Sequence, residues 1–225
     1  MTVRHRSYRS LASLQRDTSR CRACAEAGFQ LESLPVRAPL AGWQPRRRSR
    51  RGPAGEQGGA SGADGQRAYI FGQAPGVVEG RERLPWRGRA GQALRRWLDL
   101  DEETFYATFY CASVTRCYPG RAPSGRGDRT PTRREQELCE FWRDRELELL
   151  RPRLIVSVGG LALRRLLGPR QLTECVGERL ERGGAVLIAL PHPSGASGWL
   201  NVPANRERLA AATALVREEL ARLSP

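Results

Sequence analysis

Four short apolar runs set the main constraint on how this chain can fold. Each run is four to six residues long, which suits a strand covered on both faces better than a buried helix. A loop follows every run and a helical pattern follows most of them, so the strands are expected to lie parallel. The sequence therefore predicts an α/β fold, a three-layer α/β/α sandwich around a central four-stranded parallel sheet. The predicted strands are residues 68–71, 108–113, 154–158 and 185–190.

Start signals and apolar faces mark the helices around these strands. Ser10 is a predicted N-cap, because apolar residues recur at helical spacing directly after it. Thr130 is a second predicted N-cap, with Pro131 in the first turn of a helix that carries Cys139. A closing amphipathic helix is predicted over residues 209–223. These helices would cover the sheet and bring cysteines toward it.

The turn after the first strand is the most distinctive local feature. Gly72 and Gly76 flank this turn and Pro75 fixes one of its backbone angles, so its amides can approach a flat ring or a phosphate closely. A basic loop and a helix follow within residues 77–100. An ordinary strand-to-helix connection would look similar if nothing else in the chain agreed with a functional role.

Polar loops at the ends of three strands do agree with it. The carboxyl ends of parallel strands meet at one edge of a sheet, so residues 73–75, Ser113 and residues 192–194 are expected to converge there. His192 is one of two histidines, and it stands at a strand end between two prolines. A lone histidine is more often structural than catalytic, but this one is well placed for chemistry. The sequence predicts a ligand site at this edge.

The charge of the chain favours a nucleic-acid partner. Its 38 basic residues are all arginine, against 24 acidic residues, and the formal net charge is +14. The rigid arginine fork suits bidentate contact with phosphates. Residues 44–67 are rich in Arg, Gly, Ser and Ala without periodicity, which predicts a disordered insertion. Its arginines either touch a nucleic-acid backbone or form a solvated charge run.

Length and apolar content indicate a single domain over residues 1–225. No apolar run approaches the ~18 residues that would span a bilayer. The N-terminus lacks the apolar core of a signal peptide. We therefore expect a cytoplasmic protein without a membrane partner.

Six cysteines in a chain without a secretion signal indicate metal or redox chemistry rather than disulfides. Cys21 and Cys24 form a C-x-x-C pair with metal-ligand spacing. A redox pair or two buried cysteines are the alternatives, although no strand-helix-strand pattern surrounds the pair. Cys111 lies in a predicted strand and Cys175 in a predicted loop, and both are expected to be buried.

Three motifs together resemble a known family. G-Q-A-P-G and then P-W-R-G-R-A-G-Q, within residues 72–92, resemble the first motif of the iron-sulfur uracil-DNA glycosylases, or family four, which reads G-E-x-P-G-x-x-E-D and then G-R-P-F-V-G-x-A-G-Q. T-R-C-Y-P-G and then G-D-R-T-P-T-R-R-E-Q-E-L-C are similar to the family pattern K-C-R-P-P, G-N-R-x-P-T-x-x-E and C, with a longer loop. H-P-S at 192–194 matches the second motif of the wider uracil-DNA glycosylase superfamily.

The resemblance implies a monofunctional DNA-repair glycosylase. Such an enzyme flips a deaminated base, uracil above all, out of DNA and hydrolyses its N-glycosidic bond, here as a monomer on DNA with a damaged base. Four thiolates would hold a [4Fe-4S] cluster in a structural role, and tetrahedral zinc would use the same four. The implied ligands are Cys21, Cys24, Cys117 and Cys139.

The resemblance also assigns roles within the site. His192 would donate a hydrogen bond to the departing base and Gln73 would orient water, while Trp86 would stack on the extruded base. The residues implied to contact the substrate are Gly72, Ala74, Pro75, Trp86 and Ser113. The residues implied to contact DNA are Arg89, Ser194, Trp199 and Leu200. Trp199 and Leu200 are candidate wedges into the gap left by the flipped nucleotide.

Two departures from the family pattern bear on the chemistry. Gln73 stands where the family has Glu, and an amide cannot act as a general base. Ser113 stands where the family has the Asn that reads uracil, which leaves space for a larger base or a water-mediated contact. Glu79 and Glu82 are nearby carboxylates that either compensate for Gln73 or are solvated loop acids. A non-catalytic iron-sulfur nucleic-acid-binding relative and a zinc-stabilised basic adaptor are the alternative functions.

Overall fold

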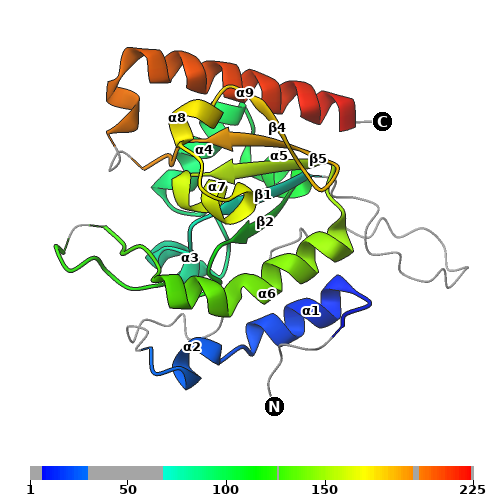
Figure 1. The fold of residues 1–225 in the computed structure, drawn as a ribbon, viewed down its shortest axis with the longest axis vertical. Coiled ribbons are helices and arrows are strands. Elements are labelled where there is room, and N and C mark those ends of the chain that lie inside the picture. The colour runs from blue at the N-terminus through cyan, green and yellow to red at the C-terminus, as the bar shows by residue number, and fades with distance from the viewer. Residues whose placement is uncertain (1–6, 30–67, 126, 195–197, 224–225) are drawn as a thin grey trace, which may run out of the picture.

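Five strands form one mixed sheet in the computed structural model, which describes residues 7–29, 68–125, 127–194 and 198–223 (Figure 1). The strand order is β2-β1-β3-β5-β4, and β2, β1, β3 and β5 run parallel. The predicted α/β/α arrangement is confirmed, and the predicted insertion 44–67 lies outside the described residues. The strands are β1 (Ala68–Gly72), β2 (Phe109–Ser113), β3 (Leu154–Val158), β4 (Arg179–Arg182) and β5 (Ala185–Leu190).

The expected count of four strands is wrong by one, because β4 was not recognised. β4 pairs antiparallel with β5 at the edge of the sheet, and its sequence R-L-E-R carries no buried apolar stripe. Edge strands tolerate charged side chains, so hydrophobic patterning does not reveal them. The two-residue connection between β4 and β5 does reveal this strand. Gly183 and Gly184 both have positive φ, at 57° and 79°, as a tight two-residue hairpin turn requires.

Helices cover both faces of the sheet (Figure 1). α4 (Arg89–Leu98) and α9 (Pro203–Leu223) contact each other on one face, while α6 (Arg133–Leu150) and α7 (Gly160–Leu167) belong to the other. α1 (Leu11–Ser19) packs along the outside of α6. None of the helices described combines the length and apolar character needed to cross a membrane. The shorter helices are α2 (Ala23–Glu26), α3 (Val77–Glu82), α5 (Glu102–Thr108), α8 (Leu172–Cys175) and the 3-10 helix η3 (Trp199–Asn201).

The caps of α1 and α6 test two sequence predictions. Ser10 caps α1, accepting a hydrogen bond from the backbone N–H of Ser13 at 3.3 Å, as predicted. The prediction of Thr130 as the cap of α6 is wrong, because the N-cap is Thr132, two residues later, and the helix begins at Arg133. Thr132 Oγ1 accepts from the N–H of Glu135, whose carboxylate accepts from the N–H of Thr132. This reciprocal pair satisfies two backbone donors at once, which no cap at position 130 would do.

A buried ion pair joins α6 to the sheet. Glu146 of α6 and Arg116, in the loop after β2, each expose only 1% of the side chain and are within hydrogen-bond contact. The hydroxyls of Tyr69 and Tyr110 donate to the same carboxylate at 2.9 and 3.1 Å. Arg116 also donates to the carbonyl oxygen of Ser113. The network therefore fixes the end of β2, where a predicted site residue lies.

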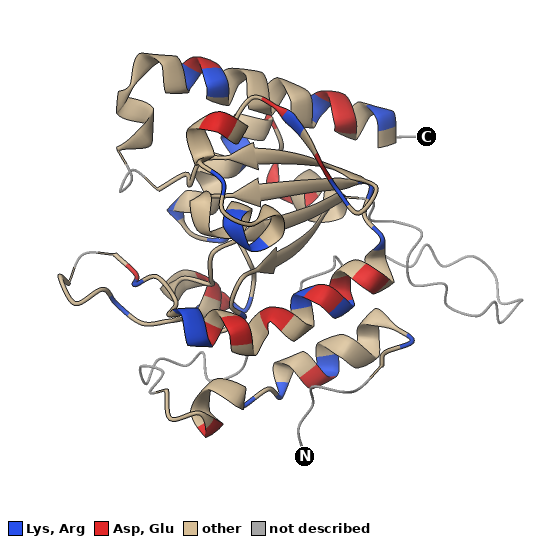
Figure 2. Ribbon diagram, viewed as in Figure 1, with Lys and Arg blue, Asp and Glu red and all other residues tan. Residues whose placement is uncertain are grey.

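Much of the helical arginine content is paired with acids. On α6 and α9, basic and acidic residues lie next to one another (Figure 2). Arg133 pairs with Glu137 at 3.0 Å on α6, and Arg222 pairs with Glu218 at 2.6 Å on α9. Because these charges offset each other locally, the outer faces of the two helices are not strongly basic. The excess positive charge of the chain therefore lies outside these two faces.

Candidate active site

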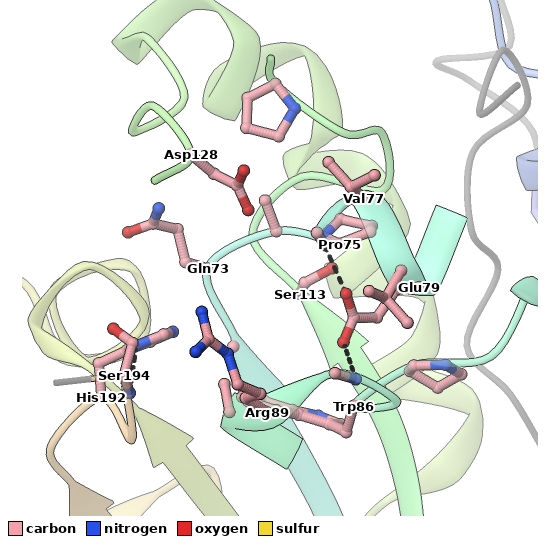
Figure 3. Close-up of a pocket in the computed structure, with 18 of the residues that line it drawn as sticks. Gln73, Pro75, Val77, Glu79, Trp86, Arg89, Ser113, Asp128, His192 and Ser194 are labelled. Atoms are coloured by element: carbon pink, nitrogen blue, oxygen red, sulfur yellow. Dashed lines mark hydrogen bonds between the residues drawn. The ribbon is translucent and has the colours of Figure 1, made fainter. Parts of the chain in front are cut away.

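A pocket of about 640 Å³ opens at the carboxyl ends of the parallel strands (Figure 3). Its walls come from the loop after β1, the start of α4, the ends of β2 and β5, and the loop before α6. The structure thus brings together residues that are far apart in the sequence. Nine predicted site residues line it: Gly72, Gln73, Ala74, Pro75, Trp86, Arg89, Ser113, His192 and Ser194.

Glu79 holds the turn of this pocket in shape. Its carboxylate accepts hydrogen bonds from the backbone N–H of Gly76 at 3.1 Å and of Gly88 at 2.8 Å (Figure 3). A Cβ on Gly76 would lie 2.7 Å from Glu79 Oε2, so a side chain there would displace the carboxylate. Both Glu79 oxygens are therefore used to join the turn to the start of α4. Glu82 is ion-paired with Arg87 at 2.5 Å, so neither acid is placed to replace a carboxylate at position 73.

Trp86 lies against the end of β1 in an unusual backbone conformation. Its φ is +58°, a region that non-glycine residues rarely adopt. Arg95 Nη1 donates to the Trp86 carbonyl oxygen at 2.9 Å. A Cβ on Gly91 would lie only 1.7 Å from that same oxygen, so α4 can approach Trp86 this closely only at a glycine. The indole covers Gly72, whose hypothetical Cβ would lie 2.7 Å from Trp86 Cζ2.

The end of β5 fixes both the position and the tautomer of His192. Its Nδ1 accepts a hydrogen bond from the backbone N–H of Ser194 at 3.2 Å and lies 2.8 Å from Ser194 Oγ. A ring nitrogen that accepts an N–H carries no proton, so the neutral ring is protonated on Nε2. Gly159, at the end of β3, lies against the ring, since a Cβ there would be 3.6 Å from His192 Cδ2. Burial lowers the pKa of His192, and the charge of Asp128 offsets part of this effect.

The two positions that depart from the family pattern are held by the loop after β2. Ser113 Oγ donates to the carbonyl oxygen of Thr115 at 2.7 Å, so the hydroxyl retains lone pairs for the pocket while its proton is engaged. The backbone carbonyl oxygen of Gln73 accepts a hydrogen bond from the backbone N–H of Thr115 at 3.2 Å. Both residues line the pocket, and Gln73 does so with a neutral amide.

Asp128 lines the same pocket, and the sequence did not single it out. It belongs to the long loop between Cys117 and Cys139, with Tyr118 OH donating to its Oδ1 at 2.9 Å. A Cβ on Gly76 would lie 3.2 Å from its Oδ2. Asp128 stands in the G-D-R-T-P-T motif, where the family pattern has Asn, but its place in the pocket depends on how the loop folds back.

The sequence of residues 60–215 matches the family model of the Uracil DNA glycosylase superfamily. The chain belongs to the uracil-DNA glycosylase superfamily. The match covers β1 to β5 and thus every strand that forms the pocket edge. It confirms the relationship that the sequence motifs indicated.

Two characterised relatives within this superfamily are similar to the chain. One is the Type-4 uracil-DNA glycosylase of Thermotoga maritima, 29% identical over 131 residues, which are 57% of this chain and 65% of that protein. The other is the Type-4 uracil-DNA glycosylase of Pyrobaculum aerophilum, 31% identical over 117 residues, 52% of this chain and 53% of that protein. The chain spans less than two thirds of the length of either relative.

The four predicted cluster ligands of this superfamily member come from three elements. Cys21 and Cys24 lie at the junction of α1 and α2, Cys117 follows β2, and Cys139 lies on α6. Burial, together with the Cys139 and Cys21 thiols, raises the pKa of Cys24 to about 12. The backbone N–H of Arg116 approaches Cys139 Sγ at 3.4 Å, a contact that stabilises a thiolate.

The thiols are near one another without meeting the geometry of a metal site. Within the described parts of the chain, no group of three or more His, Cys, Asp or Glu side chains could hold a metal ion as placed. The donor set itself fits a thiolate-bound cluster, since Cys24, Cys117 and Cys139 are all buried and influence one another electrostatically. The ligand assignment therefore stays a prediction. Cys111 and Cys175, 1% and 2% exposed, are buried as predicted.

Trp199 and Leu200 lie in η3 and are not among the described residues that line the pocket. Both are partly buried, and Trp199 packs against the hydrophobic core. Its carbonyl oxygen accepts a hydrogen bond from Asn205 Nδ2 at 2.9 Å. The structure therefore gives Trp199 a packing contact. The role of the two residues as wedges in DNA stays a prediction.

Proposed function

We propose that this protein is a DNA glycosylase that hydrolyses the N-glycosidic bond of a deaminated base, with uracil the first candidate. The observation that carries the proposal is His192, held with Nδ1 as an acceptor so that Nε2–H is its donor. The pocket around it is lined by an aromatic face and a glycine-rich turn. Membership of the uracil-DNA glycosylase superfamily and similarity to two Type-4 uracil-DNA glycosylases support the same chemistry.

His192 would act on the departing base. As the C1′–N1 bond breaks, its electron pair leaves with the base, and negative charge develops on the base oxygen. Because burial lowers the pKa of His192, the ring is neutral near pH 7, and its single N–H, on Nε2, is the donor. A preorganised donor of this kind contributes roughly 3 kcal/mol to a transition state, or about 100-fold in rate.

The other pocket residues would bind the flipped nucleotide. Trp86 supplies a stacking face beside Gly72, and its fixed backbone reduces the entropy lost on binding. Ser113, with its proton engaged by Thr115, would accept a hydrogen bond from the base edge, such as the N3–H of uracil. Arg89, exposed at the first turn of α4, and Ser194 would contact the flanking phosphates.

A [4Fe-4S] cluster held by Cys21, Cys24, Cys117 and Cys139 forms part of the proposal. The cluster would cross-link α2, the loop after β2 and α6, and it would take no part in the glycosidic step. Protein purified without oxygen should be brown, absorb near ~400 nm and contain about four irons per chain. Colourless protein with stoichiometric zinc would instead support a zinc site with the same ligands.

The function is tested with DNA oligonucleotides, single- and double-stranded, that carry one uracil, hypoxanthine or xanthine. Base release is detected by alkaline cleavage at the abasic site. We expect excision of uracil, slowed about 100-fold in His192→Ala while DNA affinity is retained. Wild-type protein with its cluster that binds DNA but releases no base would establish the non-catalytic relative instead.

A further inference from the structure

Two carboxylates are present among the described residues that line the pocket, Glu79 and Asp128. Both oxygens of Glu79 accept backbone N–H groups, so this acid is a structural part of the turn. Asp128 differs, because its side chain is exposed and Tyr118 OH donates to its Oδ1 at 2.9 Å. The Oδ2 atom of Asp128 is therefore the carboxylate oxygen of the pocket that has room to bind a water molecule.

Oδ2 of Asp128 lies close to the turn formed by residues 72–76. Oδ2 lies 3.2 Å from the position that a Cβ on Gly76 would occupy, so the carboxylate stands over the turn that carries Gln73. Its charge also reaches His192, whose pKa it raises against the larger effect of burial. The acid and the proposed donor to the base thus line one pocket, and Gln73, which belongs to this turn, lines it as well (Figure 3).

The loop that carries Asp128 is held by backbone pairing. Arg129 N–H donates to the Gly120 carbonyl at 2.9 Å, and Ala122 N–H donates to the Gly127 carbonyl at 3.1 Å. The backbone of Asp128 forms an isolated antiparallel β-bridge with the backbone of Arg121. Tyr118, only 2% exposed, holds the carboxylate through the hydrogen bond from its hydroxyl to Oδ1. This acid therefore has a defined position, unlike a solvated acid at a loop tip.

We propose that Asp128 is the catalytic base of the reaction, in place of the carboxylate that position 73 lacks; this inference rests on the proposed function. Gln73 orients the water through its amide, and Asp128 accepts its proton. The water oxygen forms the new bond to C1′, the C1′–N1 pair leaves with the base, and the proton passes from the water to Asp128 and then to solvent. The negative charge of Asp128 also stabilises the positive charge that develops on the sugar.

The test compares Asp128→Asn with the wild-type holoprotein in single-turnover excision of uracil. Asn has the same shape and still accepts from Tyr118, so the loop is retained while the proton acceptor is lost. We expect the rate to fall about 100-fold with unchanged affinity for DNA, because a general base contributes roughly 10²–10⁴. Asp99→Asn is the matched control. Asp99 is exposed at the end of α4 with φ 56°, a conformation that Asn also adopts, and its rate should not change.

A second variant separates proton acceptance from a merely structural role. Adding Gln73→Glu to Asp128→Asn returns a carboxylate to the pocket, and we expect it to restore at least about tenfold of the lost rate. The inference is overturned if Asp128→Asn excises within threefold of wild type, or if the double variant restores nothing. In either case, base release by the wild-type protein would leave the proposed function standing. Absence of base release by the wild type would overturn the function itself.

Discussion

Removing the charge of Glu146 should destabilise the protein strongly. Glu146→Gln keeps the shape of the side chain but leaves the Arg116 guanidinium, 1% exposed, without a counter-charge. The amide NH₂ also faces donors, since both Tyr69 and Tyr110 hydroxyls point at this group. Breaking a buried ion pair by losing one partner costs about 3–5 kcal/mol. For a domain of this size, each kcal/mol lowers Tm by about 2–4 °C, so Tm should fall by roughly 6–20 °C.

Thermal unfolding of the holoprotein, followed by far-UV circular dichroism, measures this effect. Glu148→Gln is the control, because Glu148 lies on the same helix, is 57% exposed and pairs with an arginine at the surface. Arg116→Met combined with Glu146→Leu removes both charges and should recover much of the lost stability. If the Tm of Glu146→Gln lies within 2 °C of the Tm of the control, loss of the Glu146 charge does not destabilise the buried Arg116, and the reasoning is refuted.

Three further predictions follow from the site. Gly72→Ala places a Cβ 2.7 Å from the indole of Trp86, so the indole must shift. We expect kcat/KM for base excision to fall about tenfold, through ~1–2 kcal/mol of lost stacking on the base. An unchanged value in single-turnover kinetics would contradict this. NMR titration should give His192 a pKa below its usual 6.5, because burial disfavours the charged ring, so excision persists in mild acid until the ring is protonated. Cys117→Ala should lose bound iron and folded structure, whereas Cys175→Ala should retain both in iron analysis and circular dichroism.

Local sequence patterns were sufficient for the strands and for most of the pocket. A short apolar run of residues has few structural alternatives when a glycine or proline ends it, so the four parallel strands were predictable within about a residue. Because parallel strands place their carboxyl ends on one edge, the convergence of Gln73, Ser113 and His192 could also be anticipated. The Ser10 cap followed from the same local reasoning.

The start of α6 and the edge strand β4 depend on local signals that hydrophobic patterning does not carry. Thr130 and Thr132 are both acceptable caps by residue type, and only the reciprocal bonds with Glu135 select Thr132. β4 forms because β5 offers an unpaired edge and the glycine pair 183–184 reverses the chain. In both cases the partner that supplies the deciding hydrogen bonds is close in the sequence, so a capping box and a two-residue glycine turn were the signals to look for.

The sequence by itself determined the fold class, the family and the edge at which the site lies, since these depend on periodicity and on residues close together in the chain. Only the tertiary structure decided what each acid does. Glu79 lies within the first motif yet is used by backbone amides, whereas Asp128 enters the pocket from a distant loop. The reason is physical: the chemistry of a carboxylate depends on the donors and charges around it, and the fold supplies these.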